Sequence, residues 1–251
     1  MFSFFHSFDI SGVDLILLSL CGLLIGMAKA GISGTGLMVV PMMASIFGGR
    51  ESVGIVLPLL IFADIFAVNY YHRHANWKHV VKLMPWALLG VILGAIFGKY
   101  IDDSQFKQTI AILVIVGIIL MIWMDIRKND TRVPSHWLFA ASLGIAGGFT
   151  SMVANAAGPI FTLYLLSMHF KKNSFIGTGA WFYFLLNFFK LPLQIFYWKQ
   201  VTLHTFTLDL FVLPLIIAGV FLGIYLVKFI PEKAYRIFII VSTLVSAIFL
   251  F

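Results

Sequence analysis

Residues 29–36 read KAGISGTG and residues 147–159 read GGFTSMVANAAGP, and these two stretches decide the fold. Each interrupts an apolar run with glycine, serine, threonine or asparagine, which are residues that weaken or end a helix. Irregular backbone at membrane depth is tolerated only inside protein or around a water-filled cavity. Paired interruptions at corresponding places in two halves of a chain indicate a solute-binding site between them.

The composition excludes a water-soluble globular protein. The chain has 251 residues, of which 61% are hydrophobic and 11% charged, and its mean hydropathy is +1.02. Soluble domains carry about a quarter charged residues. The net charge of +7 comes from residues in short loops between apolar runs, which favours an anionic lipid surface over nucleic acid as partner. With one cysteine, Cys21, an intramolecular disulfide and a multi-cysteine metal site are both excluded.

The apolar segments divide into two classes by length. A helix that crosses a membrane needs about 20 residues, with a lower limit near 17. The segments that reach this length are Val53–Tyr70, Val81–Gly98, Gln108–Met124, Phe175–Tyr197, Phe206–Val227 and Ala234–Phe251. The shorter segments are Leu15–Ala28, Leu37–Phe47, Trp137–Gly148 and Ala156–Met168. At about 1.5 Å per residue each of these is too short or marginal to cross alone, so we expect two broken-helix hairpins, either re-entrant or tilted.

The distribution of Lys and Arg supports the hairpins. If each hairpin returns the chain to the side it left, twelve of the loop Lys and Arg residues fall on one face. The opposite face then holds four, namely Arg50, Lys99, Lys107 and Lys199. Because cytoplasmic loops are enriched in basic residues, this asymmetry predicts that both termini lie outside the cytoplasm.

We therefore predict an all-α polytopic membrane protein made of two inverted repeats. Residues 1–130 form the first repeat, with a hairpin at 14–47 and spans at 53–70, 81–98 and 108–124. Residues 131–251 form the second, with a hairpin at 137–168 and spans at 175–197, 206–227 and 234–251. Matched features recur in the same order: Gly26-Met-Ala28 with Gly144-Ile-Ala146, Asp64 with Asn187, Gly94-xxx-Gly98 with Gly219-xxx-Gly223, and Phe106 with Tyr235.

Three ionisable residues lie at membrane depth, where charge is costly and usually functional. Asp64 lies near the middle of its span, Lys190 lies three residues after Asn187 on the same helical face, and Lys29 lies at the first break. Asp64 has two interpretations, a coupling or gating group and a structural tether. Lys190 also has two interpretations: it contacts an anion, or it extends its long side chain to the membrane–water interface.

The breaks themselves predict an anion site. Helix N-termini carry unpaired N–H groups and a partial positive charge, and neutral donors beside them would hold an oxyanion loosely enough to release it. Structural kinks are the alternative interpretation. The predicted substrate-binding residues are Lys29, Ser33, Gly34, Thr35, Gly36, Thr150, Ser151, Asn155, Gly158, Asn187 and Lys190, with Asp64 as the coupling residue.

Other chemistries find less support. Zinc-protease, P-loop and dinucleotide fingerprints are missing from the sequence, so we expect no metal, no cofactor and no enzyme activity. Residues 31–34, Gly-Ile-Ser-Gly, resemble the serine motif of rhomboid intramembrane proteases, which need a histidine base beside the hydroxyl. His136, His169 and His204 all lie at segment ends instead. An intramembrane serine protease and an anion channel remain as alternatives.

Several longer stretches together resemble the TauE/SafE family of sulfite and organosulfonate exporters. They are Gly31-x-Ser33-Gly34-x-Gly36 followed by Pro41, VLPLLIFAD at 56–64, YHRHANW at 71–77, VANAAGPI at 153–160 and NFFK at 187–190. The resemblance covers essentially the whole chain. Pro159 directly follows Gly158, whereas Pro41 lies five residues after Gly36, so the two half-sites need not be equivalent.

The resemblance implies a multi-pass permease of the bacterial inner membrane that moves small sulfur-containing or carboxylate anions, often outward. Sulfite, thiosulfate, organosulfonates and small carboxylates are the expected substrates. Combined with the paired breaks, this predicts a secondary transporter that works by alternating access at a midplane site. Proton coupling through the buried carboxylate of Asp64 and assembly as a homodimer are further hypotheses.

Overall fold

The structure is a computed structural model that describes residues 10–32, 35–106, 137–168 and 170–231, with isolated positions at 108, 109, 112, 116, 119, 234 and 237. In these residues the regular secondary structure is all helical, which confirms the predicted class. The predicted spans at 108–124 and 234–251 lie mostly outside the described residues.

The helices are named in chain order. They are α2 (Gly12–Lys29), α3 (Thr35–Phe47), α4 (Gly49–Tyr71), α5 (Trp77–Tyr100), α7 (Trp137–Ala154), α8 (Gly158–Ser167), α9 (Lys172–Pro192) and α10 (Leu203–Phe229). A 3₁₀ turn, η1 (His72–His74), follows α4, and a π-helical segment, η2 (Leu193–Tyr197), continues α9.

Among the described helices, α2, α4, α5, α7 and α10 are long and apolar enough to cross a membrane. Their outer faces carry exposed apolar side chains such as Ile92 and Ile96 on α5 and Phe221 and Tyr225 on α10. Extensive exposed apolar surface is unusual in a soluble monomer. These faces suit lipid, and the chain is a membrane protein.

α9 is not among these five helices, although residues 175–197 were predicted as a span. The helix itself forms over 21 residues. Its buried side includes Thr178, Asn187 and Lys190, which lower its hydropathy. α9 therefore places polar side chains inside the bundle, while its Phe188 and Phe189 are exposed.

α2 is longer than the sequence predicted. It contains 18 residues and at 1.5 Å per residue reaches about 27 Å, which makes it long and apolar enough to cross a membrane, close to the lower limit of about 17 residues. The extra turn begins at a capping box: Ser11 accepts from the backbone of Asp14, and the Asp14 carboxylate accepts from the backbone of Ser11.

α7 is also 18 residues long and runs through Gly147 and Gly148 to Ala154. The predicted interruption from residue 147 was therefore wrong for residues 147–154. Thr150 is accommodated inside the helix: its hydroxyl donates to the carbonyl of Ala146 one turn earlier, so the side chain needs no partner outside the helix.

The chain nevertheless breaks between α2 and α3 and again between α7 and α8. Gly31 has a φ of 114° just after α2, and Asn155 has a φ of 53° just after α7. A residue with positive φ ends a right-handed helix. The two interruptions predicted from the sequence are thus present, and the second is shorter than expected.

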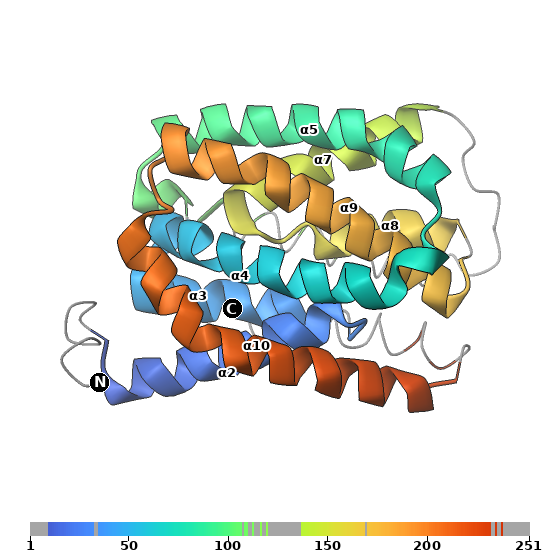
Figure 1. The fold of residues 1–251 in the computed structure, drawn as a ribbon. Helices are drawn as coiled ribbons and strands as arrows, with labels where there is room; N and C mark the ends of the chain where they lie inside the picture. Colours follow the sequence, from blue (N-terminus) through green and yellow to red (C-terminus); the bar gives the residue numbers. More distant parts are fainter. Residues whose placement is uncertain are drawn as a thin grey trace.

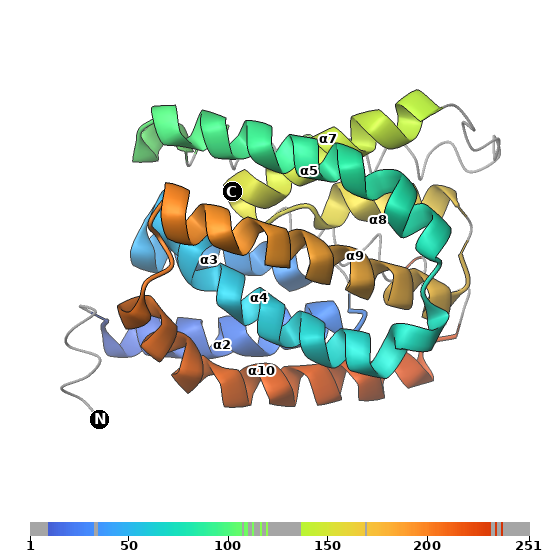
Figure 2. The same cartoon turned by 45° about the horizontal axis from the view of Figure 1, so that its top comes forward.

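The helices form three groups that Figures 1 and 2 show from two directions. α5 lies beside α7 along one side of the molecule, and α2 lies beside α10 along the opposite side. α4 and α9 pack on each other between these pairs, with α3 and α8 also in the interior. Both helix breaks consequently open toward the middle of the bundle.

Glycines bring the backbones of the two outer pairs together. A Cβ at Gly26 would collide with the carbonyl of Ile216 in α10, and a Cβ at Gly148 would collide with the carbonyl of Ala87 in α5. Such close approach allows dispersion contacts between helices that gain nothing from hydrophobic burial in lipid. We call the α2–α10 and α5–α7 contacts the two seams.

The two seams share one register. Each glycine contact of the α2–α10 seam has a counterpart in the α5–α7 seam. From α2 and α7, Gly22 contacts Val212 and Leu215 where Gly144 contacts Leu83 and Trp86, and Gly26 contacts Ile216 where Gly148 contacts Ala87. From α10 and α5, Gly219 contacts Leu23 where Gly90 contacts Ile145, and Gly223 contacts Met27 and Ala30 where Gly94 contacts Phe149 and Met152. The predicted matches of Gly26 with Gly144 and of Gly94 with Gly219 were therefore one helical turn off. A ladder of glycines every four residues looks the same after such a shift, so sequence alone could not fix the register.

Candidate functional site

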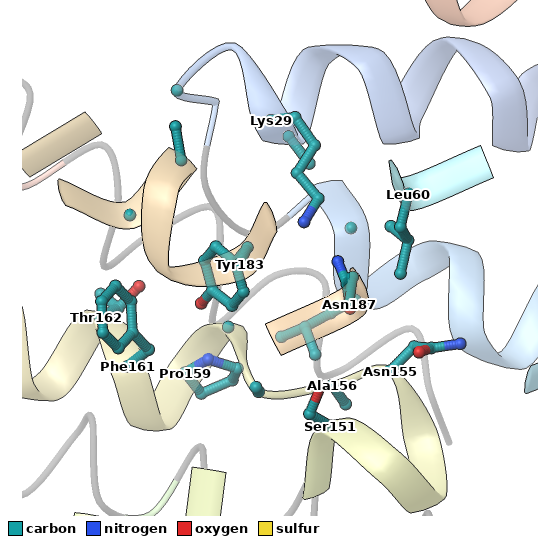
Figure 3. Close-up of a pocket in the computed structure, with 18 of the residues that line it drawn as sticks. Lys29, Leu60, Ser151, Asn155, Ala156, Pro159, Phe161, Thr162, Tyr183 and Asn187 are labelled. Carbon is teal, nitrogen blue, oxygen red and sulfur yellow. The ribbon is translucent and has the colours of Figure 1, made fainter. Parts of the chain in front are cut away.

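A central cavity lies between the two helix breaks (Figure 3). Its volume is about 130 Å³. Both breaks and two helices line it. The first break contributes Lys29, Gly31 and Gly36, and the second contributes Ser151, Asn155 and Gly158. α4 contributes Leu60, and α9 contributes Gly179, Tyr183 and Asn187. Residues far apart in sequence thus meet at one site inside the bundle.

A polar chain crosses the bundle next to this cavity. The ammonium of Lys29 lies 2.8 Å from Oδ1 of Asp64, and the amide of Asn187 donates to Oδ2 of Asp64 at 2.7 Å. The carbonyl oxygen of Asn187 in turn accepts from Nζ of Lys190 at 3.3 Å. Asp64 and Lys190 are fully buried, so the chain links α2, α4 and α9 where water has little access.

Lys190 is held by neutral oxygens. Besides Asn187, its Nζ donates to the hydroxyl of Ser151 at 3.1 Å and to Oδ1 of Asn155 at 2.6 Å. A lysine ammonium has three donors, and this arrangement uses them all. Lys190 does not line the cavity, so its position suits fastening the end of α7 to α9 rather than contacting a solute.

Asn155 is fixed from both ends of its side chain. Its Oδ1 accepts from Lys190, and its Nδ2 donates to the backbone carbonyl of Val53 at 2.9 Å. Asparagine also tolerates the left-handed backbone that this position adopts. The residue therefore ends α7, anchors that end to α4 and leaves part of its surface on the cavity wall.

Lys29 is the cation that faces the cavity. Its side chain is 12% exposed, and Nζ lies 4.4 Å from the centre of the Tyr183 ring, close enough for a cation–π interaction. Figure 3 shows Lys29 and Asn187 extending toward one another with Tyr183 beside them. Since Asp64 lies behind Lys29 and not on the cavity wall, a solute meets the positive end of this ion pair.

Helix starts contribute to the same wall. Gly36 in the first turn of α3 and Gly158 at the start of α8 both line the cavity. The first N–H groups of a helix lack partners within the helix and carry partial positive charge. Together with Lys29, they give one region of the cavity a positive potential.

The predicted site residues fall into four groups. Lys29, Gly36, Ser151, Asn155, Gly158 and Asn187 line the cavity, while Asp64 and Lys190 lie behind them in the polar chain. The hydroxyls of Thr35 and Thr150 donate to backbone carbonyls. Thr35 donates to Leu24 and Ile32, and Thr150 donates to Ala146. Ser33 and Gly34 lie outside the described residues.

Sequence reasoning missed Tyr183 and Gly179. Both line the cavity from α9, and Tyr183 lies four and seven residues before Asn187 and Lys190, hence on the same helical face. Extending that face by one turn toward the N-terminus would have found the tyrosine. An aromatic residue among many others gave no separate signal.

His79, which follows η1 in α5, connects two helices. Nδ1 of His79 lies 2.9 Å from the hydroxyl of Tyr164, which joins α5 to α8. Within the described residues no three His, Cys, Asp or Glu side chains are grouped so as to hold a metal ion.

Comparison with known families assigns the chain. Its residues 18–250 match the family model described as sulfite exporter TauE/SafE. No match was found among curated proteins or among solved structures. The match extends over both breaks, the polar chain and all eight described helices except the start of α2. The chain therefore belongs to the sulfite exporter TauE/SafE family.

Proposed function

We propose that this protein is a secondary transporter that moves a small anion through the central cavity, normally outward. Sulfite, thiosulfate, organosulfonates and small carboxylates are the proposed substrates. Family membership supports the transporter class. The observation that carries the choice of site is the Lys29–Asp64 ion pair, which presents its ammonium to a cavity between two helix breaks.

The charge arrangement suits binding followed by release. An anion in the cavity would share the Lys29 ammonium with Asp64, so the attraction that it gains is partly offset by the nearby carboxylate. Ser151, Asn187 and Tyr183 add neutral hydrogen-bonding groups around the same cavity. A site with one shared cation and neutral donors holds an oxyanion without trapping it.

The shared register of the seams supports the two inverted repeats. The first half supplies α2 to one seam and α5 to the other, and the second half supplies α10 and α7 in return. The sequence also predicts that Asp64 matches Asn187 in the two repeats, and these two residues are hydrogen-bonded in the polar chain. Repeats related in this way exchange conformations, which is the usual basis of alternating access.

A thermal-shift and transport experiment tests the proposal. Purified full-length protein is melted with sulfite, thiosulfate, methanesulfonate or acetate, and a ligand that binds only the folded state adds about 2.7 kcal/mol at a hundred times its Kd. Lys29→Met should abolish both this shift and saturable anion movement in proteoliposomes. Lys82→Met, at an exposed lysine, is the matched control.

Two outcomes would reject the proposal in different ways. If anions raise the melting temperature of Lys29→Met as much as that of the wild-type protein, Lys29 is not part of the binding site. Anion flux that rises without saturation would favour the channel alternative. The protease alternative gains no support from membership of a transporter family, and cleavage of a membrane peptide abolished by Ser33→Ala would be needed to restore it.

A further inference from the structure

A second interior carboxylate differs from Asp64 because no described residue forms a hydrogen bond or an ion pair with it. Asp209 in α10 is 0% exposed, and within the described part of the chain neither of its carboxylate oxygens has a hydrogen-bond partner. Asp64, by contrast, has Lys29 and Asn187. An ionised carboxylate buried without a partner costs several kcal/mol, so the acid form of Asp209 is the one compatible with this packing.

Asp209 lies on the helix face that forms the α2–α10 seam. It continues the buried line of Val212, Ile216 and Gly219 toward the N-terminus of α10, and the last two of these contact Gly26 of α2. Because Asp209 is buried between α10 and the helices that pack on it, α2 and α4, bringing water to Asp209 requires α10 to loosen from them.

The other seam provides an internal comparison. In the shared register Asp209 corresponds to Val80 of α5, a buried residue. Thr205, the other buried polar residue of α10, belongs to the capping box with Thr202. All later buried positions of the two faces are apolar or glycine: Val212, Ile216, Gly219, Val220, Gly223, Ile224 and Val227 in α10, and Leu83, Ala87, Gly90, Val91, Gly94, Ala95 and Gly98 in α5. Packing alone is satisfied by valine, so it gives no reason for an aspartate.

None of the described charged groups around Asp209 is bonded to it. α10 packs on α2 and α4. The titratable side chains of these three helices, besides Asp209, are Asp14, Cys21 and Lys29 in α2, Arg50, Glu51, Asp64, Tyr70 and Tyr71 in α4, and His204, Tyr225 and Lys228 in α10. Lys29 is already paired with Asp64. Since no described side chain bonds to Asp209, a proton can neutralise the carboxylate in place.

We propose that Asp209 is a proton-binding site that controls the seam between α2 and α10. The packed seam holds the carboxylic acid; release of its proton to water leaves a carboxylate, which requires the seam to admit water. α2 ends at Lys29 on the cavity wall, so loosening this seam reaches the anion site. The link to transport rests on the proposed function, whereas the proton site itself does not.

The sign of the pH effect follows from this assignment. Low pH favours the protonated group and the packed seam. Raising the pH favours the hydrated carboxylate and the loosened seam. One proton per molecule limits the change in the opening equilibrium to about tenfold per pH unit.

Cys21 offers a reporter that needs no substrate. It is the one cysteine of the chain, it is buried, and it precedes Gly22, which contacts Val212 in the seam. Maleimide labelling of purified full-length protein is measured across a pH series in wild type, Asp209→Asn and Asp209→Val. The asparagine keeps the shape of the side chain but cannot ionise. The valine copies Val80, the residue at the corresponding position of the α5–α7 seam.

The ratio of wild-type to Asp209→Asn labelling rates cancels the intrinsic reactivity of the thiol. We expect this ratio to rise with pH toward about tenfold per unit, with Glu51→Gln behaving as wild type. Both Asp209 variants should melt at or above the wild-type temperature. Equal pH profiles in wild type and Asp209→Asn, or lower melting temperatures in both variants, would overturn the proposal.

Proteoliposomes then separate this inference from the proposed function. Asp209→Asn should move the anion down its own gradient but not respond to an imposed pH gradient. A wild-type protein that moves none of the tested anions would refute the proposed function and leave the labelling result standing. Anion flux in Asp209→Asn that still follows the pH gradient would overturn the coupling role of Asp209.

Discussion

At the scale of single residues, the two interior lysines of the polar chain occupy different environments. Lys29 faces the cavity with a carboxylate behind it. Lys190 is surrounded by Ser151, Asn155 and Asn187 and has no access to the cavity. The sequence suggested anion contact for both, and the geometry favours it for Lys29 only.

Lys190→Met tests this distinction. The change leaves three interior oxygens without their donor, and each buried unsatisfied group costs about 1–3 kcal/mol, so the melting temperature of purified protein should fall markedly. The protein that remains folded should still respond to anions. A variant that melts like wild type but has lost its anion response would make Lys190 a ligand.

At the scale of helices, the glycines of the seams determine how closely α2 can approach α10. Gly26 lies against the backbone of α10, since a Cβ there would come 2.6 Å from the nitrogen of Val220. Gly12, at the start of the same helix, has open space around it. The two positions therefore separate the effect of packing from that of helix propensity.

Gly26→Ala should destabilise the protein by about 1–3 kcal/mol, the usual cost of overpacking. Gly12→Ala should be neutral or slightly stabilising because alanine favours the helix. Melting temperatures of the two purified variants provide the comparison. Equal melting temperatures would mean that α2 moves away from α10 at little cost, against the close packing described above.

At the scale of the whole molecule, the proposed two-fold relation places Asp64 opposite its own counterpart, Asn187. Each lies near a lysine: Asp64 pairs with Lys29, and Asn187 accepts from Lys190. If the halves are equivalent in this way, the carboxylate should be transferable from one half to the other.

The double variant Asp64→Asn with Asn187→Asp tests that transfer. Asp64→Asn alone leaves Lys29 without its anion, and Asn187→Asp alone places two carboxylates together, so each should lower the melting temperature. The swapped protein should recover much of the loss because Lys190 replaces Lys29 as the counter-ion. If the double variant loses as much melting temperature as the two single variants added together, the two-fold relation is contradicted.

The orientation predicted from Lys and Arg also belongs to the whole molecule. A C-terminal alkaline phosphatase fusion should be active and a C-terminal green fluorescent protein fusion dark, because that end is predicted to lie outside the cytoplasm. Fusions truncated in the loop after η1, at residue 75, should give the opposite pair of signals. Matching signals at both positions would refute the predicted orientation.

Local chemistry determined part of this architecture without help from tertiary contacts. Apolar runs predicted a helical membrane protein, and the glycine- and asparagine-containing breaks located the cavity, because residues that stop helices at membrane depth need protection from lipid. Short sequence motifs also indicated the family. Ser151, Asn155 and Lys29 were identified because polar residues are conspicuous against an apolar background.

Only the tertiary structure decided the rest. α7 continues past Gly147 because its close packing on α5, seen at Gly148, outweighs weak helix propensity. The tertiary structure also chose the glycine register and separated Lys29 from Lys190. A repeating pattern cannot fix its own offset, and a charge acquires its role from the groups that surround it.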